Sequence, residues 1–216
     1  AVLQEWARRG TPRQVEYLAE YLEAECRSRD ASKRAGLLRR CALPQPKTFD
    51  GYEWGQISWP EGFGRDELLS LSFLDAHEDL VLMGDVGTGK THMAEALCTL
   101  CCQQARPARF FTASSLVMHI RRARDDGRLD RELSQIGKAE LLVIDELGFL
   151  PLDADGARLL DEIAWQRAER HGDGGGFPTL SAPAPETAAS PALDGLRGAL
   201  RGGRSCARGR RVRPGG

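Results

Sequence analysis

The sequence contains no long apolar run, and that absence limits what the protein can be. No stretch approaches the roughly 20 consecutive apolar residues that a membrane-spanning helix needs. The N-terminal part is charged and amphipathic, without the apolar core of a signal peptide. We therefore expect a cytoplasmic protein with no membrane contact. Because the chain begins at Ala1 rather than Met, we also expect a fragment.

The cysteines lack the paired spacing of a zinc site. Cys98, Cys101 and Cys102 form a C-x-x-C-C cluster, but the other three cysteines supply no second pair at a suitable distance. The cluster falls in a segment that we expect to be a helix packed on a sheet. We predict buried thiols there, with a metal or redox site as the less favoured alternative.

Neither sign of charge dominates, because the formal net charge of the 216 residues is −1. The two ends are nevertheless basic. Residues 1–47 carry ten Lys or Arg and six acidic residues, and residues 172–216 carry seven Arg and three acidic residues. Basic flanks permit contact with nucleic acid, although a charge run is more often a solvated face.

The N-terminal part predicts a small helical module over residues 1–47. Thr11 and Gln14 form a capping box with proline at the first helical position, which starts a helix over 11–27. A second, basic helix is expected over 31–42 and ends before the prolines that follow.

Beyond residue 66 the pattern becomes α/β. The expected strands cover 80–83, 109–113 and 141–145. The expected helices cover 66–76, 90–105, 115–125, 129–136 and 154–170, the last with Leu159, Leu160, Ile163 and Ala164 inward and Asp153 as its cap. Strands that alternate with helices predict a parallel sheet with helices on both faces.

An aromatic segment precedes this part. It spans 48–64 and contains Phe49, Tyr52, Trp54, Trp59 and Phe63. We favour a loop packed on the next domain over a lid that contacts a nucleotide base, although one aromatic side chain can do both.

A complete phosphate-binding pattern follows the first strand. It reads G-x-x-x-x-G-K-T and consists of Gly84, Asp85, Val86, Gly87, Thr88, Gly89, Lys90 and Thr91. Glycines let such a loop wrap around phosphate oxygens, and the start of the next helix adds main-chain N–H groups and a favourable dipole. We predict that the loop binds ATP, that Lys90 reaches the β- and γ-phosphates in catalysis, and that Thr91 binds Mg²⁺.

Two acidic residues end the strand at 141–145. The carboxyl ends of parallel strands lie at the edge of the sheet where ligands bind. We predict that Asp145 holds Mg²⁺ and that Glu146 is the catalytic residue that polarises the attacking water. His92, directly after Thr91, is a further candidate for nucleotide contact, with contact to a neighbouring loop as the favoured alternative.

Together these motifs resemble the IstB-like ATP-binding proteins, which are AAA+ helpers of insertion-sequence transposases related to DnaC-type helicase loaders. The segments that carry the resemblance are GDVGTGKTH, GRLDRELSQIGKAELLVIDELGFLPLD and GARLLDEIA, with RGTPRQVEYLAEYLEAE near the N-terminus. The resemblance covers about residues 5–171. The run from Leu147 to Leu160 is more specific than the P-loop, which many ATPases share.

The resemblance implies both a fold and a role. The fold is a P-loop NTPase sheet of the AAA+ class, with strand order 5-1-4-3-2, preceded by a small helical module. The role is to bind double-stranded DNA, ATP and Mg²⁺ as a homo-oligomer, in support of the transposase of the same element. Two alternatives stay open: a DnaC-like helicase loader in replication, and a degenerate DNA-binding remnant without ATPase activity.

The C-terminal part departs from this family. Residues 172–216 are rich in Gly, Pro, Ala, Ser and Arg and poor in large aliphatic residues, which is typical of disorder. We therefore expect a helical module over 1–47, an ATP-binding domain over 48–171 and a disordered tail over 172–216, with incomplete C-terminal strands. A polar sensor and an arginine finger are not recognisable, and out-of-frame translation of the tail is one hypothesis.

One weak strand candidate in the tail, Phe177 to Leu180, bears on activity. In the implied order, the strand before the P-loop and the strand that bears Asp145 are joined only through strand four. If the candidate cannot form strand four, the two motifs lose their common frame. We therefore predict nucleotide binding at best, with weak or absent hydrolysis, because displacements of about 1 Å can cost on the order of 100-fold in rate.

Overall fold

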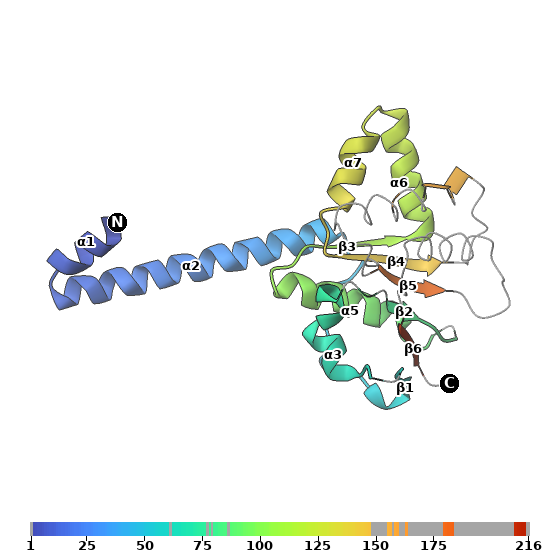
Figure 1. The fold of residues 1–216 in the computed structure, drawn as a ribbon, viewed down its shortest axis with the longest axis horizontal. Coiled ribbons are helices and arrows are strands. Elements are labelled where there is room, and N and C mark those ends of the chain that lie inside the picture. Colours follow the sequence, from blue (N-terminus) through green and yellow to red (C-terminus); the bar gives the residue numbers. More distant parts are fainter. Residues whose placement is uncertain are drawn as a thin grey trace.

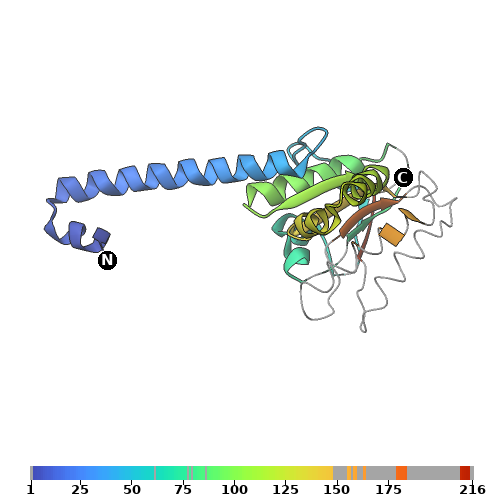
Figure 2. The same ribbon diagram turned by 90° about the horizontal axis from the view of Figure 1, so that it is seen from above.

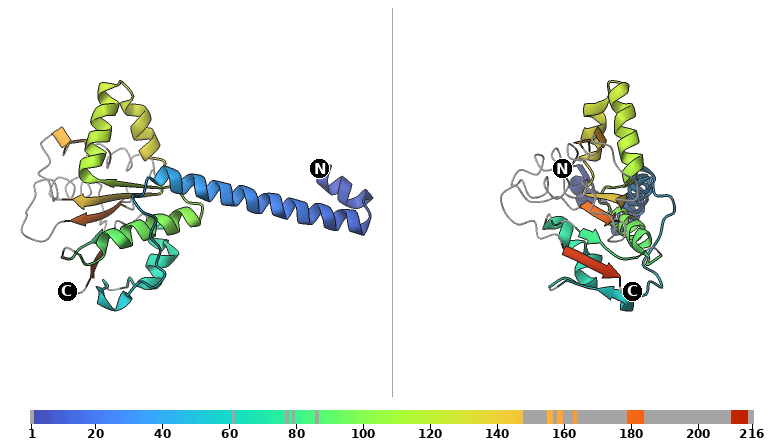
Figure 3. Two further views of the ribbon diagram at one scale, coloured as in Figure 1. Left: turned by 180° about the vertical axis from the view of Figure 1, so that it is seen from behind. Right: turned by 90° about the vertical axis from the view of Figure 1, so that its right-hand side faces the viewer.

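The computed structural model shows an α/β domain with a long helical arm (Figure 1). It describes residues 2–60, 62–76, 78, 80–85, 87–147, 155–156, 158–159, 163, 179–183 and 210–214. The arm projects from one side of the domain, and its tip carries the N-terminus. Seen from behind, the chain ends on the opposite side of the molecule (Figure 3).

The arm consists of α1 (Val2–Arg9) and α2 (Pro12–Cys41). The predicted capping box is confirmed, because the Thr11 side chain accepts from the Gln14 N–H and the Gln14 side chain accepts from the Thr11 N–H. The prediction of two helices, over 11–27 and 31–42, is wrong, since α2 is continuous. Residues 28–30 contain no glycine or proline, so nothing interrupts the backbone hydrogen bonds between the two predicted segments.

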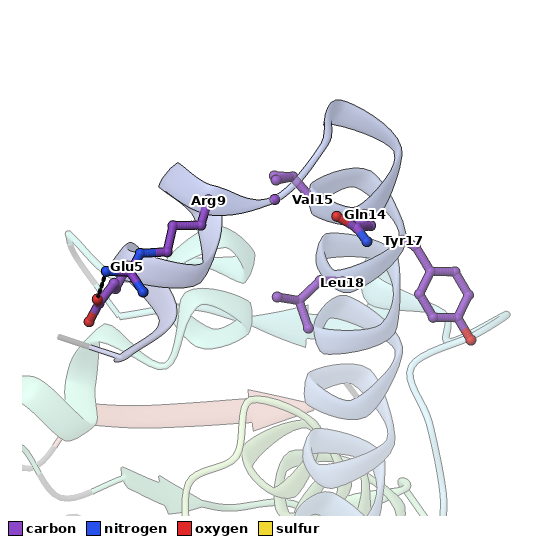
Figure 4. Close-up of a pocket in the computed structure, with 7 residues that line it drawn as sticks. Glu5, Arg9, Gln14, Val15, Tyr17 and Leu18 are labelled. Carbon is purple, nitrogen blue, oxygen red and sulfur yellow. Dashed lines mark ion pairs between the residues drawn. The ribbon is translucent and has the colours of Figure 1, made fainter.

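Most of α2 is exposed, and only Leu37 and Cys41 near its C-terminal end are buried. A cavity of about 590 Å³ lies between α1 and the first turns of α2. It is lined by Glu5, Arg9, Gly10, Gln14, Val15, Tyr17 and Leu18 (Figure 4). This cavity lies at the tip of the arm, away from the phosphate-binding loop (Figure 1). No helix in the described ranges is long and apolar enough to span a bilayer.

A six-stranded sheet forms the centre of the domain, in the order β1-β6-β2-β5-β4-β3. Its strands are β1 (Ile57–Ser58), β2 (Leu80–Leu82), β3 (Ala108–Thr112), β4 (Leu141–Leu147), β5 (Thr179–Pro183) and β6 (Arg210–Pro214). All neighbours pair in parallel except β1 and β6. When the strands are counted from β2, the run β6-β2-β5-β4-β3 is the order 5-1-4-3-2, so the implied topology is confirmed.

Two strands of this sheet come from the tail. β5 pairs with β2 and with β4, and Ser181 lies in register with Val81 on one side and Ile144 on the other. β6 pairs in parallel with β2. The expectation of incomplete strands and disorder over 172–216 is therefore corrected at these two segments, and the rest of the tail lies outside the described residues. Strand pairing uses backbone N–H and C=O groups, which a segment poor in large apolar residues still provides.

Alternate residues of β4 separate two hydrophobic clusters, one on each face of the sheet. Leu141 and Val143 belong to a cluster with α5 (Lys90–Gln103), α3 (Arg65–Ser70) and α4 (Ser72–Asp75). Leu142 and Ile144 belong to a second cluster with α6 (Ala113–Asp125) and α7 (Leu129–Ile136). Helices therefore cover both faces, as predicted, and Figure 2 shows the layers from above.

Two further helix predictions can be compared with the structure. The inward positions Leu159 and Ile163 are confirmed as buried, whereas Asp153, Leu160 and Ala164 lie outside the described residues. The single helix expected over 66–76 is wrong, because Leu71 separates α3 from α4 with φ 58°. Serine hydroxyls on both sides of Leu71 donate to the Glu67 carbonyl and so compete with the helical bonds.

Candidate functional site

The phosphate-binding loop connects the end of β2 to the start of α5, at the edge of the sheet formed by the carboxyl ends of the parallel strands. Gly87 and Gly89 have φ 86° and 84°, which only glycine adopts without strain. This backbone conformation turns the chain into α5, whose first turn exposes main-chain N–H groups. Val86, the third of the eight predicted loop residues, lies outside the described part of the chain.

The loop closes around the amino group of Lys90. Lys90 Nζ donates to the carbonyl oxygens of Gly84, at 2.8 Å, and Asp85, at 2.6 Å. The hydroxyl of Thr88 also donates to the Asp85 carbonyl, at 2.8 Å. A phosphate group that enters the loop would exchange these carbonyl partners of Lys90 for anionic oxygens, and charge-assisted bonds of that kind are the stronger ones.

Asp145 joins the second motif to the first. It is buried, with an exposed fraction of 4%, and its Oδ2 accepts a hydrogen bond of 2.8 Å from the hydroxyl of Thr91. Its Oδ1 accepts from the backbone N–H of Glu146 at 2.9 Å. A hydroxyl and a carboxylate therefore converge beside the phosphate loop. Hard oxygen ligands that leave room for water and phosphate oxygens suit Mg²⁺, so these residues fit the predicted ion.

β5 determines how far apart the two motifs lie. It occupies the position between β2 and β4, and neighbouring strands in a sheet are about 4.8 Å apart. The P-loop strand and the Asp145 strand are therefore held about 10 Å apart by a paired strand. β5 overlaps the strand candidate at Phe177 to Leu180 and pairs with both strands, so the reason for expecting weak or absent hydrolysis does not hold.

Glu146 lies in an irregular part of β4. The register with β5 shifts between Ile144 and Leu147, and Glu146 has φ 57°, uncommon for a residue with a long side chain. Such a conformation costs on the order of 1–3 kcal/mol and occurs preferentially at functional sites. The bulge leaves the side chain of Glu146 exposed beside the buried Asp145.

His92 contacts a neighbouring loop, which is the alternative that the sequence favours. Its Nε2 lies 3.0 Å from the carbonyl oxygen of Thr48, and its ring lies 5.3 Å from that of Tyr52. A direct contact of His92 with nucleotide stays a prediction. Tyr52 itself approaches the phosphate loop, and the sequence signals it only as one aromatic residue among several.

Glu95, one turn after Thr91 on α5, lies near the segment that leads into the same loop. It is buried, and the loss of hydration raises the pKa of its carboxyl group, while Lys47 and the backbone N–H of Gln45 act in the opposite direction. The segment that leads into the aromatic residues thus passes near Glu95 and contacts α5 at His92.

The cysteine cluster is buried, as predicted. Cys98, Cys101 and Cys102 on α5 are buried free thiols, and Cys41 at the end of α2 interacts with two of them. Burial raises the pKa of the Cys101 thiol, which keeps it protonated and unreactive. Within the described ranges, no group of three or more His, Cys, Asp or Glu side chains could hold a metal ion.

The fold and the site together define a P-loop protein of the AAA+ class. The strand order, the glycine loop before α5 and the acid at the end of β4 all belong to that class. Solved structures support the fold: DnaA from Aquifex aeolicus bound to AMPPCP superposes with a TM-score of 0.56 at 14% identity, over 79% of this chain and 50% of that chain. The structure of DnaI superposes with a TM-score of 0.50 at 15% identity, over 84% of this chain and 90% of DnaI.

Sequence comparison identifies the family within this class. The profile of the IstB-like ATP-binding proteins matches residues 4–172, and the chain belongs to this family. The ATP-binding protein of insertion sequence IS5376 from Geobacillus stearothermophilus is 36% identical over 155 residues, which are 71% of this chain and 61% of the relative. The ATP-binding protein of insertion sequence IS21 from Pseudomonas aeruginosa is 29% identical over 158 residues, which are 72% of this chain and 58% of the relative. The chain thus spans about three fifths of the length of these relatives.

Proposed function

We propose that this chain binds ATP with Mg²⁺ at the P-loop, hydrolyses it, and acts as a DNA-binding helper of the transposase of its own element. The hydrogen bond between Thr91 and Asp145 is the observation that carries the nucleotide part of this proposal. It joins the hydroxyl of Thr91 in one motif to the carboxylate of Asp145 in the other, although the two segments are far apart in the sequence. A glycine-rich turn that matched the pattern by chance would need no such partner.

Each side chain has a distinct role in this proposal. The N–H groups of the loop and Lys90 would hold the phosphates, while Thr91 and Asp145 would hold Mg²⁺, which would neutralise negative charge on the phosphates. Glu146 takes up the proton of the attacking water. The bulge separates the two acids, so that Asp145 faces the hydroxyl of Thr91 and Glu146 faces solvent.

The role in transposition rests on the family. The relatives are named as ATP-binding proteins of insertion sequences, and we infer that this chain supports the transposase of such an element as a homo-oligomer. The likeness to DnaA and DnaI concerns the fold alone and favours no role in replication. Measuring strand transfer by the transposase of the same element, with and without this protein, tests the inference.

Lys90→Ala is expected to weaken ATP binding by about 10- to 100-fold, because hydrogen bonds to a charged group contribute about 1.5–3 kcal/mol. Isothermal titration calorimetry of the purified chain with ATP and Mg²⁺ measures this change. Lys138→Ala is the matched control, since Lys138 is exposed and precedes β4 at the opposite edge of the sheet. Equal affinities of the wild type and Lys90→Ala would reject the proposed ATP site.

The C-terminal half of α2 offers a surface for double-stranded DNA. Its exposed cations include Lys33, Arg34, Arg39 and Arg40, which have no ion-pair partner in the described part of the chain. Arg27 and Arg29, which lie closer to the N-terminus of α2, instead pair with Glu23 and Glu25 at i,i+4 spacing. Unpaired cations on one helix attract phosphate groups and release counterions from DNA.

The double variant R39Q/R40Q is expected to reduce the slope of log K against log salt by about 2, because each phosphate contact contributes about 0.9 to that slope. The variant R27Q/R29Q removes the same number of charges from the same helix, but from residues already paired with acids. We expect a smaller change for it. Fluorescence anisotropy with a labelled duplex over a salt series measures both slopes, and equal slopes for the wild type and R39Q/R40Q would exclude this surface.

A further inference from the structure

A triphosphate bound at this site has a metal end and a nucleoside end. The metal end is set by Thr91 and Asp145 on one side of the first turn of α5. His92, the next residue on the helix, is rotated by about 100° from Thr91, and it faces the segment that contains Thr48 and Tyr52. The segment with Thr48 and Tyr52 therefore borders the first turn of α5 on a different side from Thr91 and Asp145.

Tyr52 is the residue of this segment that reaches the phosphate loop. A Cβ atom built on Gly89 would lie 3.6 Å from the hydroxyl oxygen of Tyr52, so the side chain ends in van der Waals range of the loop. Burial raises the pKa of this hydroxyl group, which keeps it protonated as a hydrogen-bond donor. Within the described part of the chain, no side-chain or backbone oxygen accepts a hydrogen bond from it.

Aromatic neighbours hold the ring of Tyr52 in place. Its centroid lies 4.9 Å from that of Trp54 and 5.6 Å from that of Phe49, and the guanidinium of Arg65 lies 5.0 Å above the Trp54 ring. The rings continue through Trp59, Phe63 and Phe73 into the core. A ring supported in this way loses little conformational entropy when a ligand stacks against it.

We propose that Tyr52, supported by His92 and the aromatic residues around it, forms the nucleoside-side wall of the site and contacts the ribose or base of the bound nucleotide. This inference rests on the proposed ATP site and assigns it a residue outside the two sequence motifs. For the segment 48–64, this proposal assigns packing to Phe49 and Trp54, and both packing and base contact to Tyr52.

Comparing ATP with inorganic tripolyphosphate separates the two ends of the ligand. Tripolyphosphate carries the same phosphate chain but has no nucleoside, so it reports on the P-loop alone. Tyr52→Ala is expected to weaken ATP binding by about 10-fold or more, because base stacking on one aromatic side chain contributes on that scale, and to change tripolyphosphate binding by less than about twofold. Tyr52→Phe keeps the ring and is expected to retain ATP affinity within about threefold.

The outcomes separate a failure of the Tyr52 contact from a failure of the proposed ATP site. Tyr21→Ala is the matched control, since Tyr21 is 60% exposed on the arm, and thermal unfolding of each variant establishes that the domain stays folded. If Tyr52→Ala binds ATP like the wild type, or loses both ligands equally, Tyr52 is not a nucleoside contact although the ATP site stands. If the wild type binds neither ligand, the proposed function fails and this inference fails with it.

Discussion

Glu146→Gln is expected to lower ATP turnover by about 10²- to 10⁴-fold, the usual contribution of a positioned general base. The affinity for ATP should stay close to that of the wild type, because the loop, Lys90 and Asp145 are untouched. The amide has nearly the same size and the same backbone, so it keeps the bulge at φ 57°. What it lacks is a carboxylate that can take up the proton of the attacking water.

Phosphate release under single-turnover conditions, with calorimetry in parallel, measures both quantities. Glu20→Gln on the exposed face of α2 makes the same chemical change away from the site and should leave turnover unchanged. Turnover by Glu146→Gln at the wild-type rate would remove this residue from the mechanism. A wild-type chain that binds ATP but never hydrolyses it would reject the hydrolytic part of the proposal.

Ser181→Pro is expected to destabilise the domain by about 3 kcal/mol or more, because proline in a central strand removes a ladder hydrogen bond and clashes with its neighbours. Ser181 pairs with Val81 on β2 and with Ile144 on β4. These are the strands that carry the two halves of the site. We therefore expect ATP binding to weaken together with the stability.

Ser181→Ala is the matched variant, since it keeps the backbone N–H and changes only the side chain. Urea unfolding followed by circular dichroism gives the free energy of unfolding for both variants. A proline variant as stable as the alanine variant would show that this segment is not the central strand. The distance between the P-loop and Asp145 would then need another explanation.

The two motifs were predictable because their chemistry is local. Gly87, Gly89, Lys90 and Thr91 follow one strand without interruption, and the required backbone and side chains occur within eight residues. Asp145 ends a strand that is apolar on both faces, which signals its place at the edge of a parallel sheet. The hydrogen bond between Thr91 and Asp145 agrees with both expectations.

The tail and the arm were harder to predict for opposite reasons. The segment Thr179–Pro183 has little apolar character, and its place between β2 and β4 depends on backbone groups offered by both neighbours. The predicted break between two helices fell at residues 28–30, because the apolar periodicity of the sequence ends there. Nothing at residues 28–30 interrupts the backbone hydrogen bonds, and α2 continues through these exposed residues.

The sequence by itself determined the P-loop, the acid at the end of β4 and the alternation of strands and helices, since each depends on residue types at short spacing. The AAA+ class followed from the resemblance of whole segments to the IstB-like proteins. Only the tertiary structure decided which strand separates the two motifs and which aromatic residue reaches the phosphate loop. The physical reason is that both depend on contacts between segments tens of residues apart. Ser181 meets Ile144 and Tyr52 meets Gly89 only once the sheet has formed.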